Sequence, residues 1–414
     1  MFDKLKRLGA ETAIYGVSTI IGRFLTFLLV PFYTNVLSSP SDYGIVATVY
    51  AYIAFLNVVY GYGMESAYFR YASGMEIGDA TQNFSTPLVS IFVTSLIFSS
   101  ILHFLSTPFA GLIGVGFGYG NVVQYSAWIL FFDALCLIPF ASLRLQNRAK
   151  LFAAIKLLNI VSNLLLNLIL LLKFKLGVEG IFISGLISSA LTFALLIPII
   201  LKQFHLDFRG DLYKHLLRFG LPLIPAALSG IAIQVIDRPI LKALTNDSVV
   251  GIYQANYRLG IFMMLVVSMF DYAWRPFFLT TAREENAKEI FSRVMTYFLL
   301  GASLIFLVLS FFIEDLVRIR ILGHHLIKQE YWSGLSIVPV VLCAYIFTGM
   351  NTVLVAGVHI EKKTHILAYT TGAGAVVNIV GNYVLIPPFG MLGAAFATLL
   401  SYMVMAGSLF VIVQ

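Results

Sequence analysis

Apolar residues follow one another along this chain in long blocks, separated by short polar stretches. Twelve of these blocks are long enough to cross a bilayer, which takes about 20 residues for a helix. They lack the strict alternation of strands, and only helices and closed barrels satisfy their backbone in hydrocarbon. The pattern predicts an all-α polytopic membrane protein with spans at residues 10–36, 42–64, 83–105, 121–143, 150–173, 178–201, 217–241, 248–273, 290–313, 333–356, 364–386 and 390–413.

Two polar interruptions are both long and rich in charge. The first, from Lys202 to Arg218, lies near the midpoint of the chain. It predicts a cytoplasmic linker at residues 202–216 between an N-terminal six-helix lobe, residues 1–201, and a C-terminal one, residues 217–414. The second, from Glu314 to Tyr331, mixes apolar and basic residues. It fits a short helix on the outer surface, or equally a solvated loop with some buried residues.

The two halves share short sequence matches in the same order. Near the start of each half, Gly44–Tyr50 aligns with Gly251–Tyr257. Near the end, Asn163 and Asn167 align with Asn378 and Asn382, each pair being followed by a Gly-x-x-Gly segment. We expect a duplication of six helices, and an even number gives both halves the same orientation in the membrane. Such an arrangement places a substrate path between the halves.

Basic residues set the expected orientation, because short loops rich in Lys and Arg stay in the cytoplasm. With the N-terminus inside, 17 of the Lys and Arg residues in the loops and at the span ends fall on the inner side and 6 on the outer side. Both termini are therefore expected in the cytoplasm. The basic stretch Met1–Leu8 precedes an apolar run long enough to span, so it predicts a retained first helix rather than a cleaved signal peptide. The net charge of +7 then follows from topology and predicts no nucleic-acid partner.

Composition excludes a soluble protein and gives no sign of an enzyme. Charged residues make up 11% of the chain, against about 25% in soluble domains. Cys136 and Cys343 lie inside apolar segments, which argues against a disulfide framework. No metal-binding spacing of His and Cys and no phosphate-binding loop is present, so we expect neither a metal, a cofactor nor ATP hydrolysis.

Four of the cations within the predicted spans are singled out, because a cation at the centre of a bilayer costs about 2.5–3.5 kcal/mol on insertion scales. Arg23 and Arg258 lie well inside the first and eighth spans, with Gln254 one turn before Arg258. Arg238 and Lys156 lie nearer the ends of theirs. One hypothesis is that these residues, Arg23 and Arg258 above all, bind an anionic head group in a wet cavity, since guanidinium groups suit phosphate. The alternative is that each is a structural ion pair or, for Lys156, a residue that reaches the interface.

Two acids accompany these cations, Asp133 in the fourth span and Asp237 in the seventh. Adjacent residues on a helix diverge by about 100°, so we expect Asp237 and Arg238 not to neutralise each other directly. The spans would then hold excess positive charge. Either acid is a candidate for coupling transport to H⁺ or Na⁺. Most of the asparagines in the fifth and eleventh spans are expected to join helices.

Several motifs together resemble one family of membrane proteins. Phe219-Gly-Leu-Pro-Leu-Ile-Pro225 is followed by Asp237-Arg238, by Tyr257-Arg258-Leu259 and by Trp274-Arg-Pro276. In the first half, Arg23, Pro31 and the loop Leu37–Gly44 agree with the same pattern. The whole chain is similar to the Wzx-type bacterial polysaccharide flippases, of the superfamily that also holds multidrug exporters and the lipid II flippase.

This resemblance implies a V-shaped molecule of two six-helix lobes around a central cavity. It implies alternating access in the bacterial inner membrane, with an undecaprenyl-pyrophosphate-linked oligosaccharide as the substrate. Arg23 and Arg258 match the family's intramembrane basic residues, and Arg238 lies within a family motif. We expect a monomer that works beside other polysaccharide-assembly proteins. A multidrug exporter is one alternative, disfavoured by the basic spans. A membrane polymerase or glycosyltransferase is another, but the chain offers only Glu314–Tyr331 as an extramembrane catalytic loop.

Overall fold

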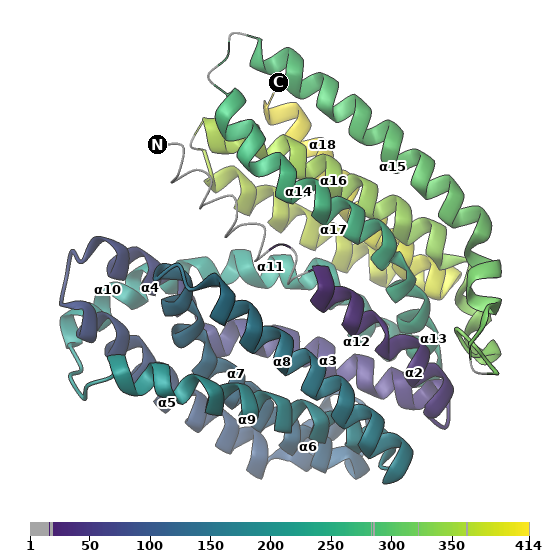
Figure 1. Cartoon of the computed structure of the whole chain (residues 1–414). Helices are drawn as coiled ribbons and strands as arrows, with labels where there is room; N and C mark the ends of the chain where they lie inside the picture. The colour runs from purple at the N-terminus through teal and green to yellow at the C-terminus, as the bar shows by residue number, and fades with distance from the viewer. Residues whose placement is uncertain are drawn as a thin grey trace. The chain divides into compact units, whose positions relative to one another are not determined.

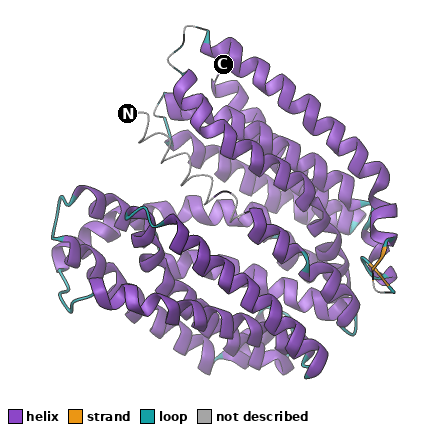
Figure 2. Ribbon diagram, in the orientation of Figure 1, coloured by secondary structure: helices purple, strands orange, loops and turns teal. Residues whose placement is uncertain are grey.

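The computed structural model describes residue 16 and residues 20–413 other than 283, 285, 322 and 362. Helices make up almost all of this part of the chain, and one small strand pair interrupts them (Figure 2). The chain divides into two compact units (Figure 1). Unit 1 comprises Met1–Thr26 and Thr48–Leu228, and unit 2 comprises Phe27–Ala47 and Ser229–Gln414.

The predicted helical spans are found in the structure. Among the described residues, 11 helical stretches are long and apolar enough to cross a membrane, and they coincide with the second to twelfth predicted segments. The first predicted segment corresponds to the shorter apolar helix Ile20–Val36. Its earlier part, with Met1–Leu8, Thr12 and Thr19, lies outside the described residues. The prediction of an all-α polytopic membrane protein is confirmed.

Unit 1 is organised around α7 (Gly120–Leu145), which lies in a span where 78% of the residues of one 18-residue apolar stretch are buried. α7 packs against α5 (Ala80–Phe104) and α9 (Gly177–Gln203), and α9 packs against α8 (Ala149–Leu168). Apolar side chains of α7, α8 and α9 form a shared core. The other elements here are α3 (Pro40–Gly61, whose first residues belong to unit 2), α4 (Met64–Gly74), α6 (Ser106–Leu112), η1 (Phe117–Tyr119), η2 (Ile169–Lys173), α10 (Gly210–Gly220) and η3 (Leu221–Leu223).

The predicted linker is folded onto unit 1. α10 packs against α4 and α5 and buries Leu212 and Leu216 completely. Before it, Gln82 at the start of α5 donates a hydrogen bond to Asp207 (2.8 Å) and accepts one from Arg209 (3.2 Å). Unit 1 therefore extends to Leu228, beyond the predicted division at residues 202–216. The physical reason is that α10 is amphipathic and its apolar face needs cover.

Unit 2 contains the long helices of the second half. α16 (Ile337–Ile360) packs against α14 (Ile261–Thr281), α15 (Ala287–Arg318) and α18 (Met391–Val413), and α18 packs against α17 (His365–Phe389) (Figure 1). Trp274, Phe278, Val353 and Ala356 form a buried cluster between α14 and α16. The remaining elements are α2 (Leu29–Val36), α11 (Ile224–Val235, shared with unit 1), α12 (Asp237–Leu244), α13 (Asp247–Tyr257), η4 (Arg258–Gly260), β1 (Arg320–Ile321), β2 (His324–His325) and η5 (Gln329–Gly334).

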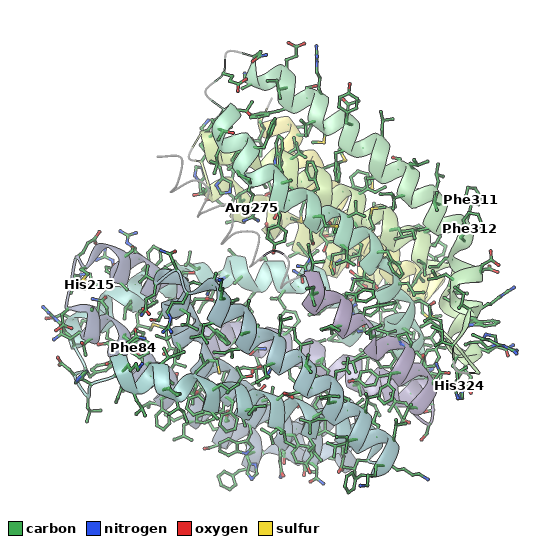
Figure 3. All side chains as sticks on the ribbon, in the orientation of Figure 1. Phe84, His215, Arg275, Phe311, Phe312 and His324 are labelled. Atoms are coloured by element: carbon green, nitrogen blue, oxygen red, sulfur yellow. The ribbon has the colours of Figure 1, made fainter. Side chains whose placement is uncertain are left out.

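Large apolar side chains cover the outer side of α15. Phe311 and Phe312 are 77% and 62% exposed and point away from the other helices of unit 2 (Figure 3). Leu300 and Leu304 are exposed on the same helix. A helix whose exposed surface is apolar is suited to lipid rather than water, which agrees with a membrane span at Ala287–Arg318.

The segment Glu314–Tyr331 does not form the surface helix that was one of its two predicted states. α15 continues to Arg318, and the antiparallel pair β1 and β2 follows, with Arg320 opposite His325. Asn35 donates a hydrogen bond to the carbonyl oxygen of His325 (3.0 Å), so the hairpin is fixed to α2. Val317 and Ile327 are fully buried. The alternative, a loop with some buried residues, describes the segment better. Its buried apolar side chains are single residues in different elements and do not form one face of a helix.

The sequence repeat has matching local structure. The Nδ2 atom of Asn167 donates to the carbonyl oxygen of Asn163 at 2.8 Å and to its side-chain oxygen at 3.1 Å. Asn382 makes the same two bonds to Asn378 at the same distances. Both sets of bonds run within one helix, α8 or α17, whereas most of these asparagines were expected to join two helices.

The repeat-related glycines Gly44 and Gly251 lie at a close helix crossing within unit 2. A methyl group on Gly44 would overlap the backbone of Asp247 in α13, and one on Gly251 would overlap the backbone of Pro40 in α3. The contact is reciprocal, because each glycine faces the residue four positions before the other, as in a two-fold symmetric interface. Only glycine allows two backbones to approach this closely.

This crossing predicts the effect of alanine at three glycines. Gly44→Ala and Gly251→Ala should each destabilise the protein by about 1–3 kcal/mol, the usual cost of overpacking. Gly372→Ala is the matched control, since nothing lies near its α carbon, and alanine in a helix should be neutral or stabilising there. Thermal unfolding of the purified variants measures this. Equal melting temperatures for the three variants would contradict the close crossing.

Candidate functional site

A polar pocket of about 470 Å³ lies inside unit 1. Its volume falls within the range of roughly 300–1,000 Å³ that is typical of small-molecule sites. Five helices contribute, and within each of α7 and α8 the lining residues share one face. The lining side chains include Asp133, Phe140 and Arg144 of α7, Phe152, Lys156 and Asn159 of α8, Ser189 and Thr192 of α9, and Asn57 and Glu65 of α3 and α4.

Asp133 and Lys156 bring opposite charges into this pocket. The carboxyl group of Asp133 is within hydrogen-bonding reach of Ser189 and in the electrostatic field of Lys156. The Nζ atom of Lys156 lies 4.3 Å from the centre of the Phe140 ring, a cation–π contact. Its side chain is exposed to the pocket. The structure thus brings together one predicted coupling residue and one predicted substrate-binding residue.

Arg144 and Glu65 form an ion pair at the same pocket. Arg144 also lies over the rings of Phe69 and Phe152, at 4.9 and 5.8 Å from their centres. Arg144 is one of the 17 basic residues expected on the inner side, and Glu65 was not among the predicted site residues. The available signal was that Glu65 and Arg144 each directly follow a predicted span, 42–64 and 121–143. Nothing in the sequence indicated that these two residues pair.

Asn159 joins α8 to α9. Its amide nitrogen donates to the carbonyl oxygen of Ser188 (3.0 Å) and to the hydroxyl of Thr192 (2.7 Å). This agrees with the expectation that the asparagines of the fifth span mainly connect helices.

Asp237 and Arg238 of unit 2 form a direct ion pair, contrary to the sequence-based expectation. The Nη1 atom of Arg238 is 2.5 Å from Oδ1 of Asp237, and the two residues are 5% and 1% exposed. The angle of about 100° between neighbouring residues describes their β carbons, whereas the long arginine side chain can turn back on itself. Asp237 is also the first residue of α12, where its carboxylate accepts the Arg238 backbone N–H at 3.0 Å.

The hydrogen-bonding groups of this ion pair are used within the protein. Arg238 donates to Gln254 through Nε (3.0 Å) and to the carbonyl oxygen of Gln234. Tyr253 donates its hydroxyl hydrogen to Oδ2 of Asp237 at 2.5 Å. The guanidinium also lies 4.3 Å from the ring centre of Tyr257. Gln254 and Arg238, both predicted to bind substrate, are thus held in one buried network with Asp237.

Arg258 differs from Arg238 in its surroundings. It begins η4, between α13 and α14, inside the span Asp247–Thr281. Its side chain is exposed and, within the described part of the chain, has no hydrogen bond or ion pair. The Arg258 guanidinium interacts electrostatically with Tyr43. Arg258 is therefore a cation in an apolar span whose charge no carboxylate of the described chain neutralises.

Arg23 belongs to unit 1 and is half-buried on Ile20–Val36. One turn further along this helix, the hydroxyl of Thr26 donates to the carbonyl oxygen of Gly22 (2.8 Å). The two arginines with the strongest sequence signal thus lie in different units.

No group of three or more His, Cys, Asp or Glu side chains is placed to hold a metal ion among the described residues. Cys136 and Cys343 are both free thiols. The described residues thus show neither a disulfide nor a metal site.

The buried network predicts that single substitutions in unit 2 will be costly. Arg238→Met should destabilise the protein by about 3–5 kcal/mol, because it leaves Asp237 as an unpaired buried charge. Asp237→Asn in the same protein should restore part of the loss. Arg293→Met is the control, since its ion pair with Glu289 is exposed and such pairs contribute about 0–1 kcal/mol. Chemical or thermal unfolding compares the three, and an Arg238→Met variant as stable as the control would contradict the network.

Comparison with known proteins agrees with this architecture. The family model for polysaccharide biosynthesis proteins matches residues 37–273. The fold is similar to that of the lipid II flippase MurJ in an inward closed conformation, with a TM-score of 0.81 and 17% identity over 97% of this chain and 87% of that one. It is also similar to an inward-facing MATE multidrug transporter of the MOP superfamily, with a TM-score of 0.75 and 14% identity over 95% of this chain and 97% of that one.

A third similar structure is the D35N mutant of the MATE transporter VcmN from Vibrio cholerae, with a TM-score of 0.69 and 16% identity over 98% of this chain and 96% of that one. A search of curated protein sequences gives no match. The family match covers more than half of the 414 residues. Together with the fold it confirms the resemblance noted in the motifs: the chain belongs to the polysaccharide biosynthesis protein family, with the fold of the MOP superfamily transporters.

Proposed function

We propose that this protein is a flippase that moves undecaprenyl-pyrophosphate-linked oligosaccharide across the bacterial inner membrane by alternating access. Membership of the polysaccharide biosynthesis family and the transporter fold support a lipid-linked flippase of this kind. The proposed orientation has both termini in the cytoplasm, from the distribution of Lys and Arg. The lipid tail of the substrate stays in the bilayer during transfer.

The observation that carries this proposal is the state of Arg258. An unneutralised guanidinium in an apolar span costs about 2.5–3.5 kcal/mol, and the described chain supplies no counter-charge for it. A pyrophosphate group would supply that charge, because a guanidinium donates to phosphate oxygens through two parallel hydrogen bonds. We assign Arg258 to the pyrophosphate, with Arg23 of unit 1 as the second cation.

The remaining predicted substrate residues take separate parts. Lys156 contacts the cargo from the unit 1 pocket. Arg238 and Gln254 have a positioning role, because Arg238 already donates hydrogen bonds to Asp237 and to Gln254. They hold α12 and α13 together, and Arg258 follows directly after α13.

Energy coupling is assigned to Asp133 before Asp237. Both carboxylate oxygens of Asp237 already accept hydrogen bonds from Arg238 and Tyr253, so that network would have to open before Asp237 could bind H⁺ or Na⁺. Asp133 lines an accessible pocket and lies beside Lys156. Loss of its charge would change the charge balance of the pocket directly.

Two other functions are less well supported. A multidrug exporter of the same superfamily would need acidic groups for lipophilic cations, but the acids of the unit 1 pocket lie beside cations. A polymerase or glycosyltransferase would need an extramembrane catalytic segment, and Arg320–His325 forms only a short hairpin. Binding of a lipophilic cation in place of a lipid pyrophosphate would favour the exporter.

The pyrophosphate assignment predicts the effect of reversing charge. Arg258→Glu should lower the rate of flipping of a labelled lipid-linked oligosaccharide in vesicles by roughly ten- to hundredfold, the worth of a hydrogen bond to a charged group. The double variant Arg23→Glu, Arg258→Glu should abolish it. Arg258→Lys should retain part of the rate. The control Arg293→Glu changes an exposed residue elsewhere, and wild-type transport by the double variant would end the proposal.

The coupling assignment predicts a loss of gradient dependence. In wild-type vesicles, collapsing the H⁺ or the Na⁺ gradient should slow flipping. Asp133→Asn should remove that sensitivity, because the side chain no longer changes charge, whereas the control Asp271→Asn should keep it. If the wild-type rate is indifferent to both gradients, Asp133 has no coupling role.

A further inference from the structure

The unit 1 pocket presents hydrogen-bond donors and acceptors side by side. The ammonium group of Lys156 only donates, the carboxylate of Asp133 only accepts, and the amide of Asn57 does both. A site for a simple anion needs donors, and a site for a cation needs acceptors. A hydroxyl group both donates and accepts, so a mixed lining matches a ligand rich in hydroxyl groups.

Several of these groups are available to a ligand. Neither Lys156 nor Asn57 has a hydrogen-bond partner in the part of the chain that the structure describes, and both are exposed. Asn159 uses its amide nitrogen for the two bonds to α9, which leaves its side-chain oxygen as a further acceptor. The pocket therefore offers free donors and free acceptors on two helices, α3 and α8.

The formal charges of the lining cancel. Glu65 and Arg144 pair with each other, and Asp133 lies beside Lys156. With two positive and two negative groups, the lining favours neither an anionic nor a cationic substrate. The rings of Phe140 and Phe152, in contact at 5.2 Å between centres, add an apolar surface. An apolar wall with a few placed polar groups is the usual form of a small-molecule site, and it matches the C–H face and hydroxyl edge of a sugar ring.

The second half of the chain has no equivalent of this lining. By their order in the two halves, α7 and α8 correspond to α16 and α17. α7 and α8 carry Asp133, Arg144 and Lys156, whereas the sequences of α16 and α17 contain no Asp, Glu, Lys or Arg. The charged pocket is thus a property of one repeat only, which distinguishes it from packing features that the repeats share, such as the asparagine pairs.

From these features we propose that the unit 1 pocket is a subsite for one uncharged sugar residue, a hexose or N-acetylhexosamine. Lys156, Asn57 and Asp133 bind its hydroxyl groups, and Phe140 and Phe152 cover its apolar side. The inference rests on the proposed flippase function, to which it adds a site for the glycan separate from the arginines assigned to the pyrophosphate. On this proposal the protein binds part of the glycan directly, in addition to the pyrophosphate.

Saturation-transfer NMR on the full chain in lipid nanodiscs tests this, since maltoside detergents themselves carry sugar. The probes are methyl glycosides of glucose, galactose and N-acetylglucosamine, with inorganic pyrophosphate as a separate sample. Wild type should transfer saturation to the ring protons of at least one glycoside. Lys156→Met and Asn57→Leu should each reduce the signal about fivefold or more, roughly the effect of losing one hydrogen bond. Lys150→Met, on the same helix but outside the pocket lining, should not.

Three results would overturn the proposal. They are an absence of transfer to any of the glycosides in wild type, an unchanged signal in both pocket variants, and Lys156-dependent binding of pyrophosphate without glycoside binding. Melting temperatures of the variants equal to wild type show that the pocket variants are folded. Vesicle flipping reports on the proposed function independently. A protein that binds glycosides at Lys156 but flips no lipid would refute the flippase and leave the subsite standing, and the converse would refute the subsite alone.

Discussion

The high cost of an unpaired charge in hydrocarbon governs the chemistry of this chain. Each ionised group inside a span must have a partner or a wet surface. Asp237 and Arg238 pair directly in unit 2, and Glu65 and Arg144 pair in unit 1. Once these are set aside, Arg258 remains exposed and unneutralised in the described chain. Arg258 is therefore the candidate residue for binding an anionic head group.

The two halves of the chain share packing features but differ in their charged groups. The asparagine pairs have identical hydrogen bonds, and Gly44 and Gly251 meet reciprocally. The charged groups do not repeat. Unit 1 holds an open pocket with free donors and acceptors, whereas unit 2 holds a closed network around Asp237. A closed network suits stability and an open one suits binding, so the symmetry of the fold does not extend to its proposed function.

The helices were predictable from sequence because an apolar run of membrane length has few alternative structures. The partners of individual side chains were less predictable from the sequence. The ion pair of Asp237 and Arg238 was missed because the angle between neighbouring residues says little about the reach of an arginine, and the pair of Glu65 and Arg144 because it joins residues far apart in the chain. The segment Lys202–Gly220 packs onto unit 1 because the apolar face of its amphipathic helix is buried against α4 and α5. Such contacts are tertiary, and no local pattern contains them.

The central claim is that Arg258 carries the counter-charge of a pyrophosphate. A cryo-electron microscopy structure of the full chain with bound lipid-linked pyrophosphate tests it most directly. The account predicts phosphate oxygens at about 2.7–2.9 Å from the guanidinium nitrogens of Arg258, the distance of a charge-assisted hydrogen bond. A phosphate bound elsewhere, with Arg258 facing acyl chains or paired with a carboxylate, would contradict it.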